Sequence, residues 1–121
     1  MSSLADSLGR VMAVQGVRAA ALIDIGTGMV LRSTGVQDSG FPAAAASLAD
    51  EARLARATLA SGEAGDLDEI SLVTGGRLHL SKVLPTLPGD GVLLFVDLDR
   101  NRVTIALASL QVRQLAPAVL A

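Results

Sequence analysis

The sequence contains no cysteine, tryptophan or tyrosine, and its only aromatic rings besides that of its single histidine are Phe41 and Phe95. The lack of cysteine excludes disulfides, thiolate nucleophiles and cysteine-ligated zinc. The scarcity of aromatic rings argues against single-stranded nucleic acid as a ligand, because proteins that bind it stack its bases on such rings. A net charge of −2 and an isoelectric point near 5.2 argue against nucleic acids of any kind.

Long apolar segments are also missing. No stretch approaches the roughly 18 uninterrupted apolar residues of a transmembrane helix. Near the N-terminus, Asp6, Gly9 and Arg10 interrupt the apolar run that a secretory signal peptide requires. We therefore expect a cytoplasmic protein that does not insert into membranes.

The residues that are abundant are aliphatic. Hydrophobic residues make up 50% of the 121 residues and charged residues 18%, which is typical of one globular domain over residues 1–121. Its core must therefore be built from alanine, valine, leucine and isoleucine. Lys82 is the only lysine among ten basic residues, and together with the many alanines this is typical of a high-GC bacterial genome.

Three segments have the apolar spacing of amphipathic helices, namely residues 3–14, 43–61 and 102–115. The second carries an alanine-rich stripe, which lets its packing partner approach closely. The third has two nearly opposite apolar sides, so we expect one side to contact a sheet and the other to contact the first helix or another subunit. The expected N-caps are Ser2 or Ser3 for the first helix and Asp99 or Asn101 for the last.

Five segments are predicted to be strands, joined mainly by short turns that contain glycine. Gly26 and Gly28 lie in the first hairpin, and Gly75 and Gly76 in the second, where two glycines suit the positive φ angles of a tight turn. The order α-β-β-α-β-β-β-α predicts an α/β fold, an α+β sandwich with a five-stranded antiparallel sheet and helices on its faces. The predicted strands are residues 17–24, 29–33, 69–74, 77–84 and 91–96.

Several of these segments carry patterns that occur together in one protein family. They are Gly16-Val17, the run from Ala20 to Asp24, the run from Met29 to Ser33, the helix over residues 43–60, the run from Gly75 to Leu80, the run from Gly89 to Leu94, and Asn101. In this order, over essentially the whole chain, they resemble the roadblock family, which is named after a dynein light chain. The resemblance implies a roadblock/profilin-like sandwich, and many members bind or regulate small Ras-like GTPases.

The resemblance also implies where other proteins bind. Members form homodimers or heterodimers by joining their sheets through the third strand, here about Glu69–Thr74, and by packing their second helices together, here about Ala43–Ala60. We therefore expect a homodimer that binds a small Ras-like GTPase, with no catalytic residue, no arginine finger, no cofactor and no metal. The interface candidates are Ala44, Ser47, Glu51, Leu54, Ala55, Thr58, Ile70, Leu72, Val73 and Thr74.

Leu54 points to this surface independently of the resemblance. It lies roughly 120° around the helix from the buried stripe. Two explanations stay open: a single exposed leucine, which is common on protein surfaces, or a contact with a second subunit.

The segment from Asp24 to Gly28 suggests a different function. Asp24-Ile25-Gly26-Thr27-Gly28 looks like the first phosphate loop of the actin and heat-shock chaperone ATPases. That fold needs two large lobes and a second phosphate loop, which a chain of 121 residues does not supply. A hairpin turn that requires glycine is the favoured interpretation, and a nucleotide-binding fragment is the alternative.

The remaining polar residues predict no catalytic site. His79 has no nucleophile and orienting partner at a recognisable spacing, and we expect it and Ser81 to face solvent or an interface. The acidic residues of the 63–69 segment lack the register of a calcium loop and predict a solvated loop. A third possible function is a small-ligand sensor, which would need an apolar pocket with a few polar groups.

Overall fold

The chain was analysed as a computed structural model that describes residues 3–59, 63, 65–86 and 89–120. Its strands form one antiparallel sheet in the order β2-β1-β5-β4-β3. The predicted fold class and element order are therefore confirmed. The elements are α1 (Leu4–Met12), β1 (Val17–Asp24), β2 (Val30–Gly35), α2 (Phe41–Leu59), β3 (Glu69–Val73), β4 (Arg77–Leu84), β5 (Val92–Asp99) and α3 (Ile105–Leu115), with 3-10 turns at Arg100–Arg102 and Ala116–Ala118.

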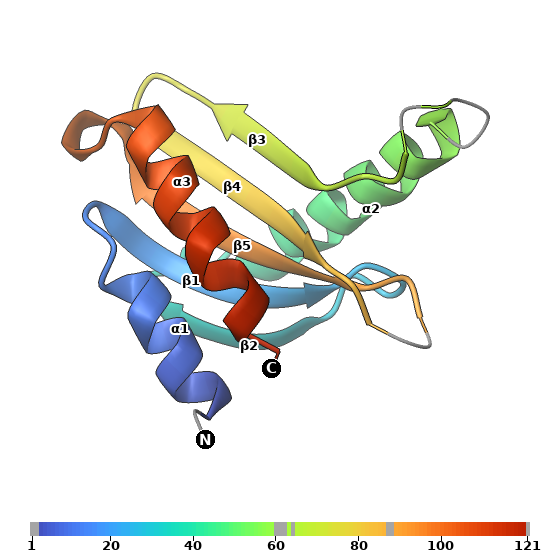
Figure 1. Ribbon diagram of the computed structural model, residues 1–121, viewed down its shortest axis with the longest axis horizontal. Helices are drawn as coiled ribbons and strands as arrows, with labels where there is room; N and C mark the ends of the chain where they lie inside the picture. Colours follow the sequence, from blue (N-terminus) through green and yellow to red (C-terminus); the bar gives the residue numbers. More distant parts are fainter. Residues whose placement is uncertain (1–2, 60–62, 64, 87–88, 121) are drawn as a thin grey trace.

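The sheet lies between two helical layers (Figure 1). α1 and α3 cover one face, where their residues join alternate residues of β1, β4 and β5 in one buried cluster. α2 alone covers the other face, where Ala45, Ala49 and Ala52 join the remaining residues of those strands in a second cluster. Within the described residues, no helix combines the length and apolar character needed to cross a bilayer.

The first two helices begin close to where the sequence places them. Ser3 caps α1, because its hydroxyl accepts the Asp6 amide at 3.1 Å while the Asp6 carboxylate accepts the Ser3 amide at 3.3 Å. α2 begins at Phe41, two residues earlier than predicted. Residues 60–61 of the predicted helix lie outside the described residues.

The last helix begins later than predicted. Asp99 accepts the Asn101 amide at 3.0 Å and so caps a 3-10 turn instead of the helix, after which Val103 is extended. Thr104 is the residue that precedes α3, and residues 102–104 are therefore not part of it. Of its two apolar sides, the one with Ala108 and Val112 contacts the sheet, whereas Leu107 and Leu110 are exposed.

The second hairpin does not use its glycines as predicted. Neither Gly75 nor Gly76 has a positive φ, and in the first hairpin only Gly28 does. The second turn is closed by Thr74, whose amide donates to the Arg77 carbonyl at 3.0 Å and whose hydroxyl accepts the Arg77 amide at 3.0 Å. This side-chain hydrogen bond replaces one backbone bond of a tight primed turn, so positive φ angles are not needed.

Gly35, in contrast, is a position where only glycine fits. It has φ +93°, and a Cβ there would overlap the Arg18 carbonyl oxygen and lie 2.8 Å from Ala19 Cα. We expect Gly35→Ala to lower the free energy of unfolding by at least about 2 kcal/mol, from backbone strain together with the clash. Gly75→Ala, which meets no atom within 4 Å, should change it by less than about 1 kcal/mol. Urea unfolding followed by circular dichroism measures both, and equal losses would contradict this account.

Candidate functional site

The outer face of α2 carries most of the interface candidates. Leu54 is 69% exposed, the highest value among the large hydrophobic side chains of the described residues. It lines a shallow groove of about 410 Å³ with Glu51, Ala55, Thr58 and Leu59. Ala44 and Ser47 are exposed at the other end of the helix. The structure therefore places the six α2 candidates on the part of the helix that faces away from the sheet or along its flank. They are Ala44, Ser47, Glu51, Leu54, Ala55 and Thr58.

The other four candidates lie on or next to β3, at one edge of the sheet. Leu72 and Val73 are 48% and 44% exposed. Leu72 pairs with His79 and Val73 with Leu78, so the two side chains point to opposite faces of the sheet. Ile70 shares the face of Leu72 and packs against the α2 cluster, whereas Thr74 follows the strand and is exposed. Of these four, Ile70 and Leu72 are thus the residues that share a face with α2.

The two edges of the sheet differ in how open they are to further strands. On β2, the register shifts between its pairs with Leu22 and Ile23, so Leu31 is an extra residue, and Arg32 beside it is exposed. Bulges and charged side chains discourage pairing of an edge strand. β3 keeps a regular register with β4 over all five residues and contains no proline. Its one charged residue, Glu69, is largely buried and paired with Arg113 at 2.9 Å. β3 is therefore the edge suited to pair with another strand.

A polar cluster lies on the α2 face that sequence reasoning missed. Asp97 is 8% exposed in a strand that is otherwise apolar up to Leu98. Its carboxylate lies 2.9 Å from Arg77 Nη1 and 3.2 Å from His79 Nε2, and the His79 ring stands edge-on to Phe95 with centroids 5.1 Å apart. A charged residue inside an apolar strand was the signal that could have predicted such a cluster.

Two expectations for β4 are affected by this arrangement. His79 is half-buried and held against Asp97 and Phe95. Ser81 was expected to face solvent or an interface, but it is 1% exposed. The reason is its position in the register, between Ile70 on β3 and Phe95 on β5, both of which belong to the α2-side cluster.

Burial and ion pairing act on the Asp97 carboxyl in opposite directions. Burial alone would raise its pKa, because a charge is poorly solvated there. The hydrogen bond and charge of His79, together with Arg77, outweigh that effect and lower the pKa of Asp97 below its ordinary value. Asp97 is therefore ionised at neutral pH and holds Arg77 and His79 in place.

The segment from Asp24 to Gly28 forms a closed turn. The Asp24 carboxylate accepts the amide of Thr27 at 2.9 Å and its hydroxyl at 2.7 Å, and the Gly28 amide donates to the Asp24 carbonyl at 2.8 Å. A Cβ on Gly26 would lie 3.2 Å from an Asp90 carboxylate oxygen. These carboxylates would repel a phosphate, which favours the interpretation as a structural turn.

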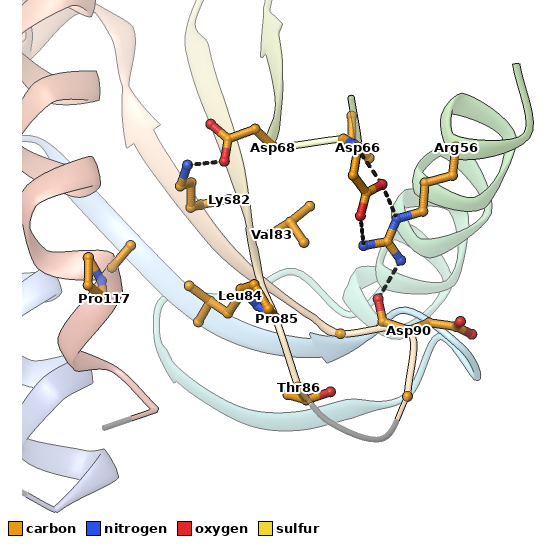
Figure 2. A pocket seen from close by; sticks show the side chains of 14 residues that line it. Arg56, Asp66, Asp68, Lys82, Val83, Leu84, Pro85, Thr86, Asp90 and Pro117 are labelled. Atoms are coloured by element: carbon orange, nitrogen blue, oxygen red, sulfur yellow. Dashed lines mark hydrogen bonds and ion pairs between the residues drawn. The ribbon is translucent and has the colours of Figure 1, made fainter. Parts of the chain in front are cut away.

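A pocket of about 560 Å³ opens between the end of β4, the start of β5 and the segment after α3 (Figure 2). Its floor is apolar and includes Val83, Leu84 and Pro85.

Two cations border this pocket, and both are paired. Arg56 Nε lies 3.0 Å from Asp66 while its Nη1 donates to the Asp90 carbonyl, and Lys82 lies 2.5 Å from Asp68. The acidic segment was predicted to be solvated, and Asp66 and Asp68 are indeed exposed, yet they also tie that segment to α2 and β4. Within the described residues, no three acidic or histidine side chains are grouped to hold a metal ion.

The arrangement of strands and helices matches known structures. Neither a protein-family model nor a curated protein sequence matches this chain. The roadblock/LC7 domain from Streptomyces avermitilis superposes with a TM-score of 0.71 at 21% identity, covering 92% of this chain and 88% of that one. The gliding protein MglB from Thermus thermophilus superposes with a TM-score of 0.79 at 18% identity, covering 96% and 84%. The chain has the roadblock fold. The Myxococcus xanthus MglB structure agrees, with a TM-score of 0.71 at 14% identity over 97% and 85% of the two chains.

The lowered pKa of Asp97 makes stability depend on pH. The ionised carboxylate stabilises the folded chain above the ordinary carboxyl pKa of 3.8, and this contribution is lost as the pH falls through the lower folded-state pKa. At neutral pH, Asp97→Asn should lower the free energy of unfolding by roughly 1–3 kcal/mol. The difference from the unmodified protein should shrink on acidification below that value.

Urea unfolding over a pH series measures this difference. Asp50→Asn is the control, because Asp50 is exposed and pairs only with Arg53 on the surface of α2, so its effect should be small at every pH. An Asp97→Asn effect that stays constant or grows on acidification would contradict the assignment.

Proposed function

We propose that this protein is a homodimeric, non-catalytic interaction module that binds a small Ras-like GTPase in the cytoplasm. The observation that carries the proposal is the open β3 edge lying beside the exposed outer face of α2. Leu72 and Ile70 share the α2 side of the sheet, so strand pairing and helix packing can use one continuous surface. A surface with both features is expected of a protein that adds a second sheet to its own.

A twofold axis at β3 explains why both parts of this surface are exposed. Antiparallel pairing of two β3 strands would satisfy their free backbone groups and extend the sheet across both subunits. Each α2 would then lie beside its partner, with Leu54 and the small side chain of Ala55 in or next to the contact. Both subunits present the same patch to each other, as a twofold interface requires.

A GTPase-binding role rests on the resemblance to the roadblock family, and the described residues near His79 do not favour catalysis instead. Ser81 is buried beneath its neighbours and cannot reach a substrate. His79 is oriented by Asp97, yet no hydroxyl nucleophile stands beside it among the hydrogen bonds of the described residues. The solved MglB structures, one of which is in a tetrameric arrangement, are consistent with a fold that assembles. A regulator or scaffold is therefore favoured over an enzyme.

The dimer can be tested with charged substitutions on the two parts of the interface. Leu54→Glu and Leu72→Lys would each bury a charge if the interface forms, at a cost of several kcal/mol. We expect the unmodified protein to sediment as a dimer and both variants as folded monomers in analytical ultracentrifugation.

Leu110→Glu is the matched control, because Leu110 is 50% exposed on α3, on the opposite face of the sheet. This variant should remain dimeric, and circular dichroism should show that all variants are folded. A monomeric unmodified protein, or dimers that survive both substitutions, would contradict the interface.

The GTPase partner can be tested by affinity capture from the native lysate with GDP or a non-hydrolysable GTP analogue. We expect a small GTPase to be recovered in one nucleotide state, since a regulator must discriminate between the two states. Purified components should reproduce the preference, and a hydrolysis assay would then show whether the effect is activation, inhibition or tethering. Failure to recover any GTPase with either nucleotide counts against this part of the proposal.

A further inference from the structure

A second pocket, of about 460 Å³, lies on the α2 face at the start of α2. Its walls include both phenylalanines of the chain, Phe41 and Phe95, whose ring centroids are 5.6 Å apart, and the only histidine, His79. Pockets that bind small molecules combine such apolar and aromatic walls with a few polar groups. Three aromatic rings thus converge at one pocket, and Phe95, which is 5% exposed, lies beneath its surface.

A bulge in β1 brings a cation to this pocket. The register between β1 and β5 shifts between Val17, which pairs with Leu98, and Ala19, which pairs with Asp97. Arg18 is therefore the extra residue, and bulges turn side chains away from the alternation of a regular strand. Arg18 lines the pocket, is half-buried, and makes no ion pair within the described residues. Regular alternation would have placed its side chain on the α1 and α3 face.

The charged groups around the pocket leave one guanidinium without an ion-pair partner among the described residues. Arg77 is paired with the Asp97 carboxylate at 2.9 Å, so Arg18 is the guanidinium of the lining that is left to meet a ligand. The first turn of α2 borders the pocket without an acidic residue of its own, and a helix N-terminus favours negative charge. Asp38 is the one other carboxylate in the lining, and it is exposed.

We propose that this pocket binds a small molecule that carries a carboxylate on a planar, apolar body. Arg18 holds the carboxylate through the forked geometry of its guanidinium. Phe41 and His79, which are half-buried, contact the body above the buried ring of Phe95. The pocket touches the proposed dimer surface only at Ala44 and Thr74, and its charged groups belong to neither part of that surface. The groups that would bind the ligand are therefore distinct from the residues of the proposed dimer surface.

The single histidine makes the site measurable, because its ring gives one resolved set of imidazole proton signals in NMR. Benzoate, titrated at constant pH, should shift the His79 signals until they saturate, with a Kd on the order of 1 mM for so small a probe. Benzamide has the same shape without the charge and should cause no saturable shift. Sedimentation of the same sample reports the oligomeric state separately.

Three variants test the assignment of residues. Arg18→Gln should weaken benzoate binding roughly tenfold, the size expected for one charge-assisted hydrogen bond. Gln37→Glu places a negative charge in an exposed loop residue of the lining with little change of size, and should weaken binding without disturbing the strands. Arg32→Gln removes the same charge as Arg18→Gln from the exposed β2 edge and should leave binding unchanged.

Two kinds of result would overturn the proposal. If benzoate produces no saturable shift of His79, or if benzamide produces the same shift, the pocket does not bind carboxylates. Binding that is unchanged by both Arg18→Gln and Gln37→Glu would overturn the assignment to this pocket.

Discussion

Burial of β5 on both faces is the constraint on which the rest of the structure depends. All residues from Val92 to Leu98 are buried, and they alternate between the cluster under α1 and α3 and the cluster under α2. A strand in that position must be apolar on both sides, or its polar groups must be paired. Asp97 is the exception in this strand, and its two partners come from β4, where His79 lies directly opposite it and Arg77 two residues away. The polar cluster therefore follows from placing one carboxylate in the most buried strand.

The two faces of the sheet are covered unequally, and this leaves a free surface. α1 and α3 cover one face and α2 covers the other (Figure 1). α2 lies close to the sheet because alanines form its inner side. Gly28 also allows this close approach, because a Cβ at that position would lie only 3.1 Å from Ala46 Cα. One helix cannot cover five strands, so the β3 side of that face and the region beside the start of α2 stay partly open. The exposed Leu72 of β3 and the pocket at the start of α2 lie in these uncovered regions.

The sequence predicts the fold well because its elements differ in period and are separated by glycine and proline. It also predicts Leu54 as an outward residue, since that follows from helical geometry alone. The errors arise where a side chain replaces a backbone interaction: Thr74 closes the second turn in place of positive φ angles, and Asp99 caps a 3-10 turn in place of the last helix. The pocket beside α2 could not be predicted, because Arg18 reaches it through a bulge. Periodicity assumes regular pairing and would assign Arg18 to the other face.

The two irregularities in β1 pairing have different consequences. The bulge opposite β2 leaves Leu31 as an extra residue and makes that edge a poor template for another strand. The bulge opposite β5 turns Arg18 toward the pocket. β3, which lacks such an irregularity, remains the edge open to pairing. The regular strand β3 thus forms the proposed surface for a protein partner, whereas the bulged strand β1 contributes to the proposed pocket for a small anion. The two lie on one face, where they share Ala44 and Thr74 and where Leu72 of the dimer surface lies opposite His79 of the pocket.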